Sequence, residues 1–402
     1  MFSLSACTDF ATAKDLTKNI RPQKVETHIA HDTADLAVTD FSARLFKATA
    51  EDGKNTLISP LSVLCALAMT ANGANGVTRA EMESTFGINT DSLNSFLHLY
   101  MSTLPQDKKY KLSLANSIWI NDDDSLTVNE DFLQTNTDYY GAEIYKTQFS
   151  RKTKNLINDW VNEKTDGMIP EIIRDIPTNT VMYLINALCF DAEWHDIYED
   201  IQVREGTFTC EDGKKTQVEF MHSTENKYLE DDFATGFIKY YKNAKYAFVA
   251  LLPNEGTTAI DYIKTLDGEH IKTLLSSADD DAYHTVYASI PKFETEYENE
   301  LSSILYRMGI KDAFSVKNAD FSRLGSSQKG NLYINRVIHK TYISVSEIGT
   351  RAGAVTAVEK NCGAALPTDV KEVYLDRPFV YMLIDCENNI PFFIGTLMNP
   401  EK

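Results

Sequence analysis

Val345-Ser-Glu-Ile-Gly-Thr-Arg-Ala-Gly-Ala-Val-Thr-Ala357 is the stretch that decides how this sequence is interpreted. Within it, every second residue from 350 to 356 is small: Thr350, Ala352, Ala354 and Thr356. Because successive side chains of a strand point to opposite faces, these four would share one face of an extended chain. A face of small side chains allows a strand to enter between existing strands without forcing a packed core apart.

The same stretch is a poor strand by composition. Its two glycines and three alanines have low β-propensity, and glycine loses the most conformational entropy on ordering. We therefore predict a segment that can be loop or strand, with a hinge at Gly349. From Glu359 to Asp369 there is no sustained periodicity, and the small residues and Pro367 predict an exposed loop that a protease can cleave.

Motifs on both sides give this hinge its context. They are Ile338-His339-Lys340, Glu347-x-Gly349-Thr350, Asp376-Arg-Pro-Phe379 and Gly395-x-x-x-Asn399-Pro400. In this order they resemble the reactive-centre region of a serpin, a member of a family of serine protease inhibitors. Taken alone, the stretch would fit a Gly/Ala-rich surface linker better than a reactive-centre hinge. Further matches cover nearly the whole chain: Ser59-Pro60-x-Ser62, Asn186-Ala187-x-x-Phe190-x-x-x-Trp194, Pro291-Lys292-Phe293 and Ala319-Asp-Phe-Ser322.

The resemblance implies an α+β fold, as a serpin-like single domain with about eight to nine helices, three β-sheets and an exposed reactive-centre loop at about 347–371. We expect this domain over 31–402, and a tether or the remnant of a signal segment over 1–30. The order of patterns agrees, because helical patterns come first and strand patterns dominate later, which favours α+β over alternating units.

Local patterns predict individual elements. Ser59 as N-cap and Pro60 as first helical residue predict a helix to about Ala71, and Thr78-Arg-Ala-Glu81 predicts a capping box that opens the next helix. Helical periodicity recurs at 153–167, 260–276 and 301–308. Strand patterns occupy 110–120, 182–194, 216–221, 237–241, 247–252 and 285–293.

The resemblance also assigns roles to matching positions. The hinge would comprise Glu347, Gly349, Thr350, Ala352, Ala354 and Thr356. Counting seventeen residues from Glu347, as the family does, places the reactive bond at Gly363–Ala364, within a range of 362–366. Two departures from the family pattern are Ile348, where a charged residue is usual, and a rather long C-terminal side of the loop.

Two further groups of residues match family landmarks. Ser59, Ser62, Asn186 and His339 match the shutter, a hydrogen-bonded polar cluster beneath the central sheet. Trp194, Lys292 and Glu347 match the breach, where insertion of the loop begins. Polar groups buried in such a cluster need hydrogen-bond partners. An exposed ion pair is worth only about 0–1 kcal/mol, so we expect the breach pair to control insertion rather than to stabilise the fold.

The implied function is inhibition of serine proteases as a suicide substrate, in which a cleaved loop inserts into the central sheet with the protease still attached. The small residues Gly363 and Ala364 suit an elastase-like or a subtilisin-like target. The alternative is a non-inhibitory serpin that acts as a carrier, chaperone or binding protein, although such members tend to have bulky or charged hinge residues. An unrelated α+β enzyme is a more distant alternative. We expect a monomer.

Composition excludes several classes of function. A net charge of −19 over 402 residues argues against nucleic acid as a partner and favours solubility. No apolar run reaches the roughly 18–20 residues that span a bilayer. Six scattered cysteines without C-x-x-C predict neither a disulfide framework nor a zinc site. G-x-S-x-G, H-E-x-x-H and Walker motifs are absent, so we expect no enzyme, metal or cofactor.

The N-terminus leaves two possibilities open. Leu4-Ser-Ala-Cys7 resembles a bacterial lipobox, in which the cysteine is acylated after signal cleavage. Only six residues precede Cys7, so either the start is truncated or the match is chance. We expect an extracellular, secreted bacterial protein without a transmembrane segment, anchored through lipid on Cys7 if the lipobox is real.

Overall fold

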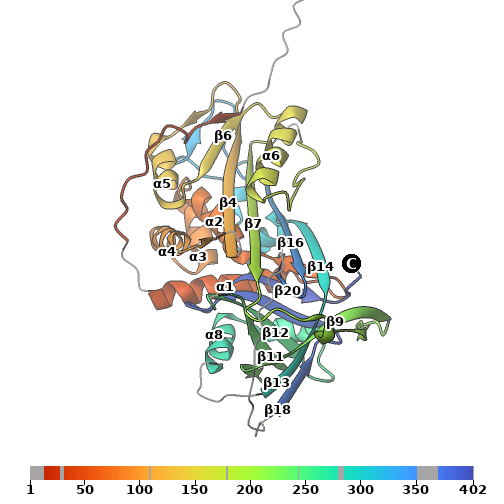
Figure 1. Ribbon diagram of the computed structural model, residues 1–402. Coiled ribbons are helices and arrows are strands. Elements are labelled where there is room, and N and C mark those ends of the chain that lie inside the picture. The colour runs from red at the N-terminus through yellow and green to blue at the C-terminus, as the bar shows by residue number, and fades with distance from the viewer. Residues whose placement is uncertain are drawn as a thin grey trace, which may run out of the picture.

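The computed structural model describes residues 13–27, 31–107, 110–177, 180–242, 244–278, 285–350 and 370–401, and within them strands from both halves of the sequence meet in one central sheet. In order across the sheet its strands are β1 (Lys14–Asp15), β6 (Glu143–Thr147), β4 (Tyr110–Asn121), β7 (Met182–Glu193), β17 (Gly349–Thr350), β16 (Arg336–Val345) and β14 (Phe293–Glu300), with β3 (Gln106–Asp107) paired to β4. The long strands β4, β7, β16 and β14 run side by side (Figure 1).

Two other large sheets lie beside the central one. The six-stranded sheet has the order β10 (Tyr228–Glu230), β11 (Ala234–Tyr240), β12 (Tyr246–Pro253), β19 (Phe379–Asp385), β20 (Ile390–Leu397) and β2 (Thr56–Ile58). The four-stranded sheet has the order β18 (Val370–Tyr374), β13 (Thr285–Pro291), β9 (Lys215–Glu225) and β8 (Val203–Thr209). A small pair joins β15 (Gly325–Ser326) to β5 (Thr127–Val128).

Nine α-helices occur among the described residues. They are α1 (His31–Thr49), α2 (Pro60–Ala71), α3 (Gly76–Phe86), α4 (Thr90–Ser102), α5 (Glu130–Tyr140), α6 (Arg151–Lys164), α7 (Ala259–Thr265), α8 (Gly268–Ser277) and α9 (Ser302–Met308). The expectation of an α+β domain with eight to nine helices and three sheets is therefore confirmed, with the two-stranded pair in addition.

Helices cover both faces of the central sheet. Helix α2 is buried along its whole length and packs against β4 and β7, within the main apolar core. On the opposite face, α6 lies over the sheet (Figure 1), and Ile157 and Val161 belong to a second apolar cluster with Tyr183 and Ile185 of β7. Because side chains of β7 alternate between the faces, Asn186 points toward α2 while Ile185 points toward α6.

Three local predictions needed correction. Residues 285–293 are not one strand: the chain leaves the four-stranded sheet after Pro291 and enters the central sheet at Phe293. The pattern at 260–276 forms two helices, because the Asp267 side chain accepts from the N–H of His270 and starts α8. The capping box at Thr78–Glu81 is wrong, since α3 begins earlier, at Gly76.

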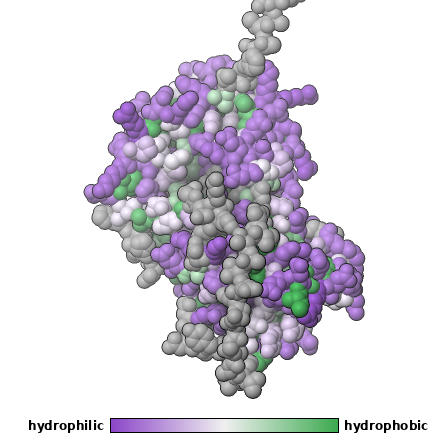
Figure 2. All heavy atoms as spheres, viewed as in Figure 1, coloured by the Kyte–Doolittle hydropathy of each residue, from purple (hydrophilic) through white to green (hydrophobic). Residues whose placement is uncertain are grey.

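The N-terminal segment also has structure that its composition did not suggest. Lys14 and Asp15 pair with Lys146 and Tyr145 and so extend the central sheet at its β6 edge. Further along, the N–H of Gln23 donates to Asp138 Oδ1 of α5 at 2.7 Å. The outer surface is mostly hydrophilic in the view of Figure 2, in keeping with the net charge of −19.

Candidate functional site

The predicted hinge begins inside the central sheet. The parallel ladder between β7 and β16 runs from Tyr183–Arg336 to Ala187–Lys340. Further along β7, Gly349 pairs with Glu193 and Thr350 with Ala192, and Thr350 also pairs with Val345 of β16. Two neighbouring strands therefore part at one end, and β17 lies in the space between them.

Local chemistry explains why these residues occupy the space. A Cβ on Gly349 would lie 2.1 Å from the carbonyl oxygen of Ala192, so only glycine permits this approach. Thr350 is 2 % exposed, and its hydroxyl hydrogen-bonds the hydroxyl of Tyr241 beneath the sheet. The other predicted hinge residues Ala352, Ala354 and Thr356, the reactive bond Gly363–Ala364 and Cys7 lie outside the described residues.

The four predicted shutter residues come together. His339 of β16 and Asn186 of β7 are register partners, and Asn186 is also the partner of Asn116 on β4. These three residues form a polar row across three strands, and the start of α2 places Ser59 and Ser62 beneath it. Each of the four predicted residues is at most 1 % exposed.

Hydrogen bonds in the shutter fix the state of His339. The N–H of Ser59 donates to Nε2 of His339 at 3.1 Å, so Nε2 carries the lone pair. Nδ1 therefore carries the proton and donates to Asn186 Oδ1 at 3.2 Å. Burial lowers the pKa of the imidazole to about 3, which agrees with a neutral ring.

Asn186 is the centre of the shutter. Its Oδ1 accepts from the hydroxyl of Ser62 as well as from His339, and its Nδ2 donates to the carbonyl of Ser62 and, at 2.6 Å, to Asn116 Oδ1. The Oγ of Ser59 is buried and has no hydrogen-bond partner among the described residues. Ser59 therefore precedes α2 as predicted, but it contributes its backbone N–H rather than a side-chain cap.

The predicted breach residues surround the turn that joins β16 to β17. Trp194 donates from Nε1 to the carbonyl of Ser346 at 2.8 Å and from its backbone N–H to the carbonyl of Ile348 at 2.9 Å. Its ring is 1 % exposed and stacks on Tyr241 at 4.4 Å. Trp194 therefore holds the turn through hydrogen bonds to the main-chain carbonyls of Ser346 and Ile348.

Lys292 adds an ion pair to the same turn. Its ammonium lies 3.1 Å from Glu347 Oε2 and 3.0 Å from Glu219 Oε2. A bond from its own backbone N–H and the ammonium of Lys292 both lower the pKa of the Glu347 carboxyl. The side chains of Lys292 and Glu347 are 29 % and 39 % exposed, so solvent screens this pair.

The sequence analysis did not predict three residues that take part in these two clusters: Asn116, Tyr198 and Tyr241. A signal existed for Asn116, because it is the polar position among Leu112, Leu114, Ile118 and Ile120 on one face of its strand. Tyr198, which donates its N–H to the carbonyl of Glu347 at 2.9 Å, lies in an irregular segment without periodicity. Aromatic residues of this kind are indistinguishable from core residues in a single sequence.

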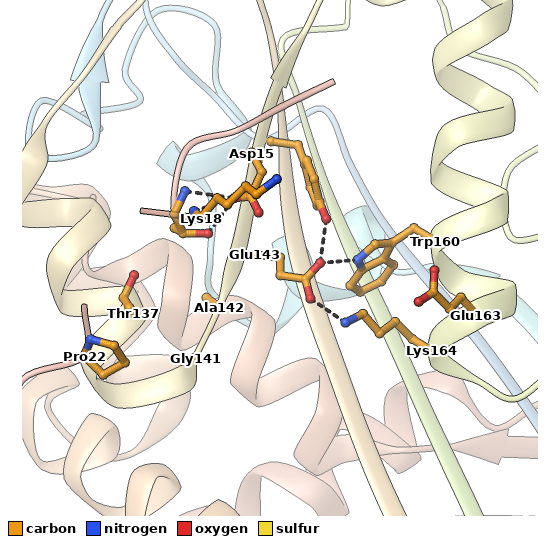
Figure 3. A pocket seen from close by; sticks show the side chains of 12 residues that line it. Asp15, Lys18, Pro22, Thr137, Gly141, Ala142, Glu143, Trp160, Glu163 and Lys164 are labelled. Atoms are coloured by element: carbon orange, nitrogen blue, oxygen red, sulfur yellow. Dashed lines mark hydrogen bonds and ion pairs between the residues drawn. The ribbon is translucent and has the colours of Figure 1, made fainter. Parts of the chain in front are cut away.

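A second polar site lies toward the β6 edge of the sheet, where α6 meets β6. Figure 3 shows Glu143 beside Trp160 and Lys164 of α6. These residues border a hollow of about 480 Å³ that the N-terminal segment helps to line. Glu143 Oε2 accepts from the Tyr145 hydroxyl and from Trp160 Nε1, both at 2.6 Å, and Oε1 pairs with Lys164. This carboxylate ties α6 to the sheet edge.

Two kinds of feature are absent from the described ranges. They hold no group of three or more His, Cys, Asp or Glu residues that could bind a metal ion. No helix in the described part of the chain is both long enough and apolar enough to cross a membrane.

Comparisons with known proteins find similarity over nearly the whole chain. The family model described as "Serpin (serine protease inhibitor)" matches residues 36–400. An uncharacterized serpin-like protein of Thermococcus kodakarensis is 31 % identical over 375 residues, which cover 91 % of this chain and 85 % of that protein.

Solved structures show similarity to the same family. The native state of tengpin, a thermophilic serpin, has 45 % identity and a TM-score of 0.92, covering 96 % of this chain and 99 % of tengpin. Its latent state has 42 % identity and a TM-score of 0.80, covering 94 % and 99 %. Human thyroxine-binding globulin, in complex with thyroxine, has 26 % identity and a TM-score of 0.81, covering 92 % and 100 %.

Proposed function

The chain belongs to the serpin family, and from this premise we propose that it inhibits serine proteases as a suicide substrate. One observation carries the proposal: β7 and β16 part, and Gly349 and Thr350 already lie between them. A strand that extends from Thr350 along the same space would complete the sheet. The small residues Ala352, Ala354 and Thr356 fit this path, because they continue the face on which Thr350 is buried.

The chemistry begins with the protease. Its serine attacks the carbonyl of Gly363, the peptide bond to Ala364 breaks, and the acyl group remains on the serine while the amine departs. As in the family generally, the chain itself supplies no catalytic group. Cleavage separates residues up to Gly363 from the rest of the chain, so they are free to insert.

Insertion would supply the driving force. About thirteen new backbone hydrogen bonds at roughly 0.5–1.5 kcal/mol each give on the order of 10 kcal/mol before side-chain burial. A strand entering between β7 and β16 would also separate His339 from Asn186, so the shutter must open. The acylated protease moves with the strand, and distortion of its oxyanion hole slows deacylation by roughly 10²–10³-fold per donor lost.

The finer parts of the proposal concern target and location. Gly363 and Ala364 support an elastase-like or subtilisin-like protease, because a small side chain before the bond suits a shallow or broad pocket. We further propose a monomer that acts outside the cell. The lipobox-like Leu4–Cys7 supports an anchored form, which mass spectrometry of the native chain and of Cys7→Ser would test.

The decisive experiment mixes the purified protein with elastase, subtilisin, chymotrypsin and trypsin. We expect an adduct that survives heat and SDS with elastase or subtilisin, and release of a peptide that begins at Ala364. A protease whose active-site serine has been blocked is the control and should give neither product. Cleavage without an adduct, or no cleavage by any of the four, would reject inhibition of these proteases and favour a binding role like that of thyroxine-binding globulin.

A further inference from the structure

A buried cation to which the proposed function assigns no role lies beneath the breach. Lys239 of β11 is 3 % exposed, and its ammonium lies 3.0 Å from Glu225 Oε1 at the end of β9. Glu225 is itself largely buried, with a 13 % exposed side chain. A buried ion pair is costly to desolvate, and an apolar side chain of similar shape is often as stable or more so. The pair therefore calls for an explanation other than stability.

The surroundings of the Lys239 ammonium suggest such an explanation. It lies 4.4 Å from the ring centroid of Tyr198 and 5.5 Å from that of Trp194. Both distances are within the roughly 6 Å over which a cation is attracted to an aromatic face. Burial alone would lower the pKa of Lys239, but Tyr198 and Glu225 more than offset this and raise it, so the side chain stays charged.

Trp194 and Tyr198, which we call the hinge clamp, are the residues that hold the turn between β16 and β17. Together they donate to three consecutive carbonyls: Trp194 Nε1 to Ser346, the Tyr198 N–H to Glu347 and the Trp194 N–H to Ile348. Residues 195–197 between them belong to no named helix or strand. Trp194 forms an isolated bridge with Tyr241, and the N–H of His195 donates to the carbonyl of Tyr240, but no strand continues from there to Tyr198.

We propose that Lys239, held by Glu225, is a positioning residue that cross-links the two rings of the hinge clamp and so keeps the hinge in register between β7 and β16. The ammonium attracts both rings only when both are in place. Loss of the charge would let the rings move apart, and the carbonyls of 346–348 would lose their donors together. Gly349 and Thr350 would then leave their pairing with β7 more often.

This inference deepens the proposed function, because a hinge held in register is the starting point for insertion. Its test needs no protease, so it can fail or succeed separately from inhibition. The measurement is hydrogen exchange by mass spectrometry on the full chain, in the peptides that contain 194–198 and 346–350. When opening and closing are fast, the exchange rate reports the population of the open clamp.

The variants are Lys239→Met, which keeps the length and removes the charge, and Lys239→Arg, which keeps the charge. We expect at least tenfold faster exchange in both peptides for Lys239→Met and near-native exchange for Lys239→Arg. Lys242→Met is the matched control, since Lys242 is half-exposed and pairs with Glu193 at 3.3 Å; it should leave both peptides unchanged. A purely structural role for Lys239 would instead raise exchange throughout the molecule.

A double-mutant cycle addresses the route of the effect. Tyr198→Leu removes one ring and keeps the N–H that binds Glu347. If Lys239 acts through the rings, Lys239→Met and Tyr198→Leu are strongly non-additive, and the double variant exchanges little faster than the faster single one. Unchanged hinge exchange in Lys239→Met, a uniform rise across the chain, or additive effects would each overturn the proposal. Should Lys239→Met fail to fold, Tyr198→Leu alone keeps the proposal testable: loss of one ring should speed exchange in both peptides, and unchanged exchange would overturn the proposal.

Discussion

Ser59 donates its backbone N–H to Nε2 of His339 at 3.1 Å, which leaves no space for a proton on that nitrogen. If Nε2 were protonated as well, its N–H would face the N–H of Ser59, and neither group could accept a hydrogen bond. The shutter therefore tolerates only the neutral ring. Since His339 and Asn186 lie on the two strands that must separate for insertion, the charge of this ring bears on stability and on mechanism together.

The first prediction concerns pH. The folded-state pKa of His339, about 3, is below the ordinary value near 6.5, so the unfolded chain binds more protons between these limits. The contribution of His339 is complete above pH ~6.5 and is lost as the pH falls toward 3, by about 2 kcal/mol between pH 7 and pH 5. Denaturant unfolding at both values should show this loss in the native chain and a smaller one in His339→Gln. Equal losses would contradict the assignment.

The second prediction concerns the hinge face. Thr350 is 2 % exposed and bonded to Tyr241, so arginine at 350 cannot take its place in the sheet. We expect Thr350→Arg, and likewise Ala354→Glu, to turn the inhibitor into a substrate that is cleaved without a stable adduct. Denaturing gels with the target protease measure the ratio of adduct to cleaved product. Arg351→Lys, at a position that the strand period assigns to the other face of an extended chain, should keep the native ratio. Undiminished adduct in Thr350→Arg would refute this prediction.

The third prediction concerns the breach pair. Glu347 and Lys292 are partly exposed, so Glu347→Gln should change the free energy of unfolding by no more than about 1 kcal/mol. We nevertheless expect the uncleaved loop to insert faster on heating, because the turn loses its tie to Lys292. Native gels after timed heating follow this conversion. Lys54→Met, which breaks the exposed pair with Glu51, is the comparison and should convert like the native chain.

The fourth prediction concerns the attachment of α6. Bonds from Lys164, Tyr145 and Trp160 outweigh the effect of burial and lower the pKa of Glu143. Its contribution is therefore present above the ordinary pKa near 4.3 and is lost as the pH falls through the lowered value. At pH 7, Glu143→Gln should destabilise the fold by roughly 1–3 kcal/mol, measured by urea unfolding. Glu163→Gln, on α6 next to Lys164, should have little effect, and equal losses in the two variants would argue against a special role for Glu143.

Sequence reasoning succeeded where a pattern is local or a motif is specific. The residues predicted for the shutter are spread from Ser59 to His339 in the sequence, and in the structure the four lie in hydrogen-bond contact. The small neighbours of Gly349 predict a hinge there, but the reason that only glycine fits, the carbonyl of Ala192, comes from a strand more than 150 residues earlier in the sequence.

Sequence reasoning failed where side chains form hydrogen bonds or ion pairs with residues far away in the sequence. Thr78 and Glu81 have capping-box spacing, yet Thr78 Oγ1 accepts from the N–H of Asp320 at 3.0 Å and Glu81 accepts from the N–H of Lys311 at 2.8 Å. These long-range bonds compete with the local cap and prevail. Likewise nothing in the sequence links Lys239 to Glu225, because their contact exists only after two sheets have packed.

The six-stranded sheet has a consequence for how the chain is made. Its strand β2 pairs with β20, and in this pairing Thr56 lies opposite Thr396, which comes 340 residues later in the sequence. Until the last strand has left the ribosome, this edge of the sheet is unpaired and the core-facing side of α1, which packs against β20, is uncovered. Synthesis at about 5–20 residues per second therefore leaves an apolar, incomplete intermediate for tens of seconds. The chain can complete this sheet only after β20 has been synthesised, and factors that bind nascent apolar surfaces should affect its yield in the cell.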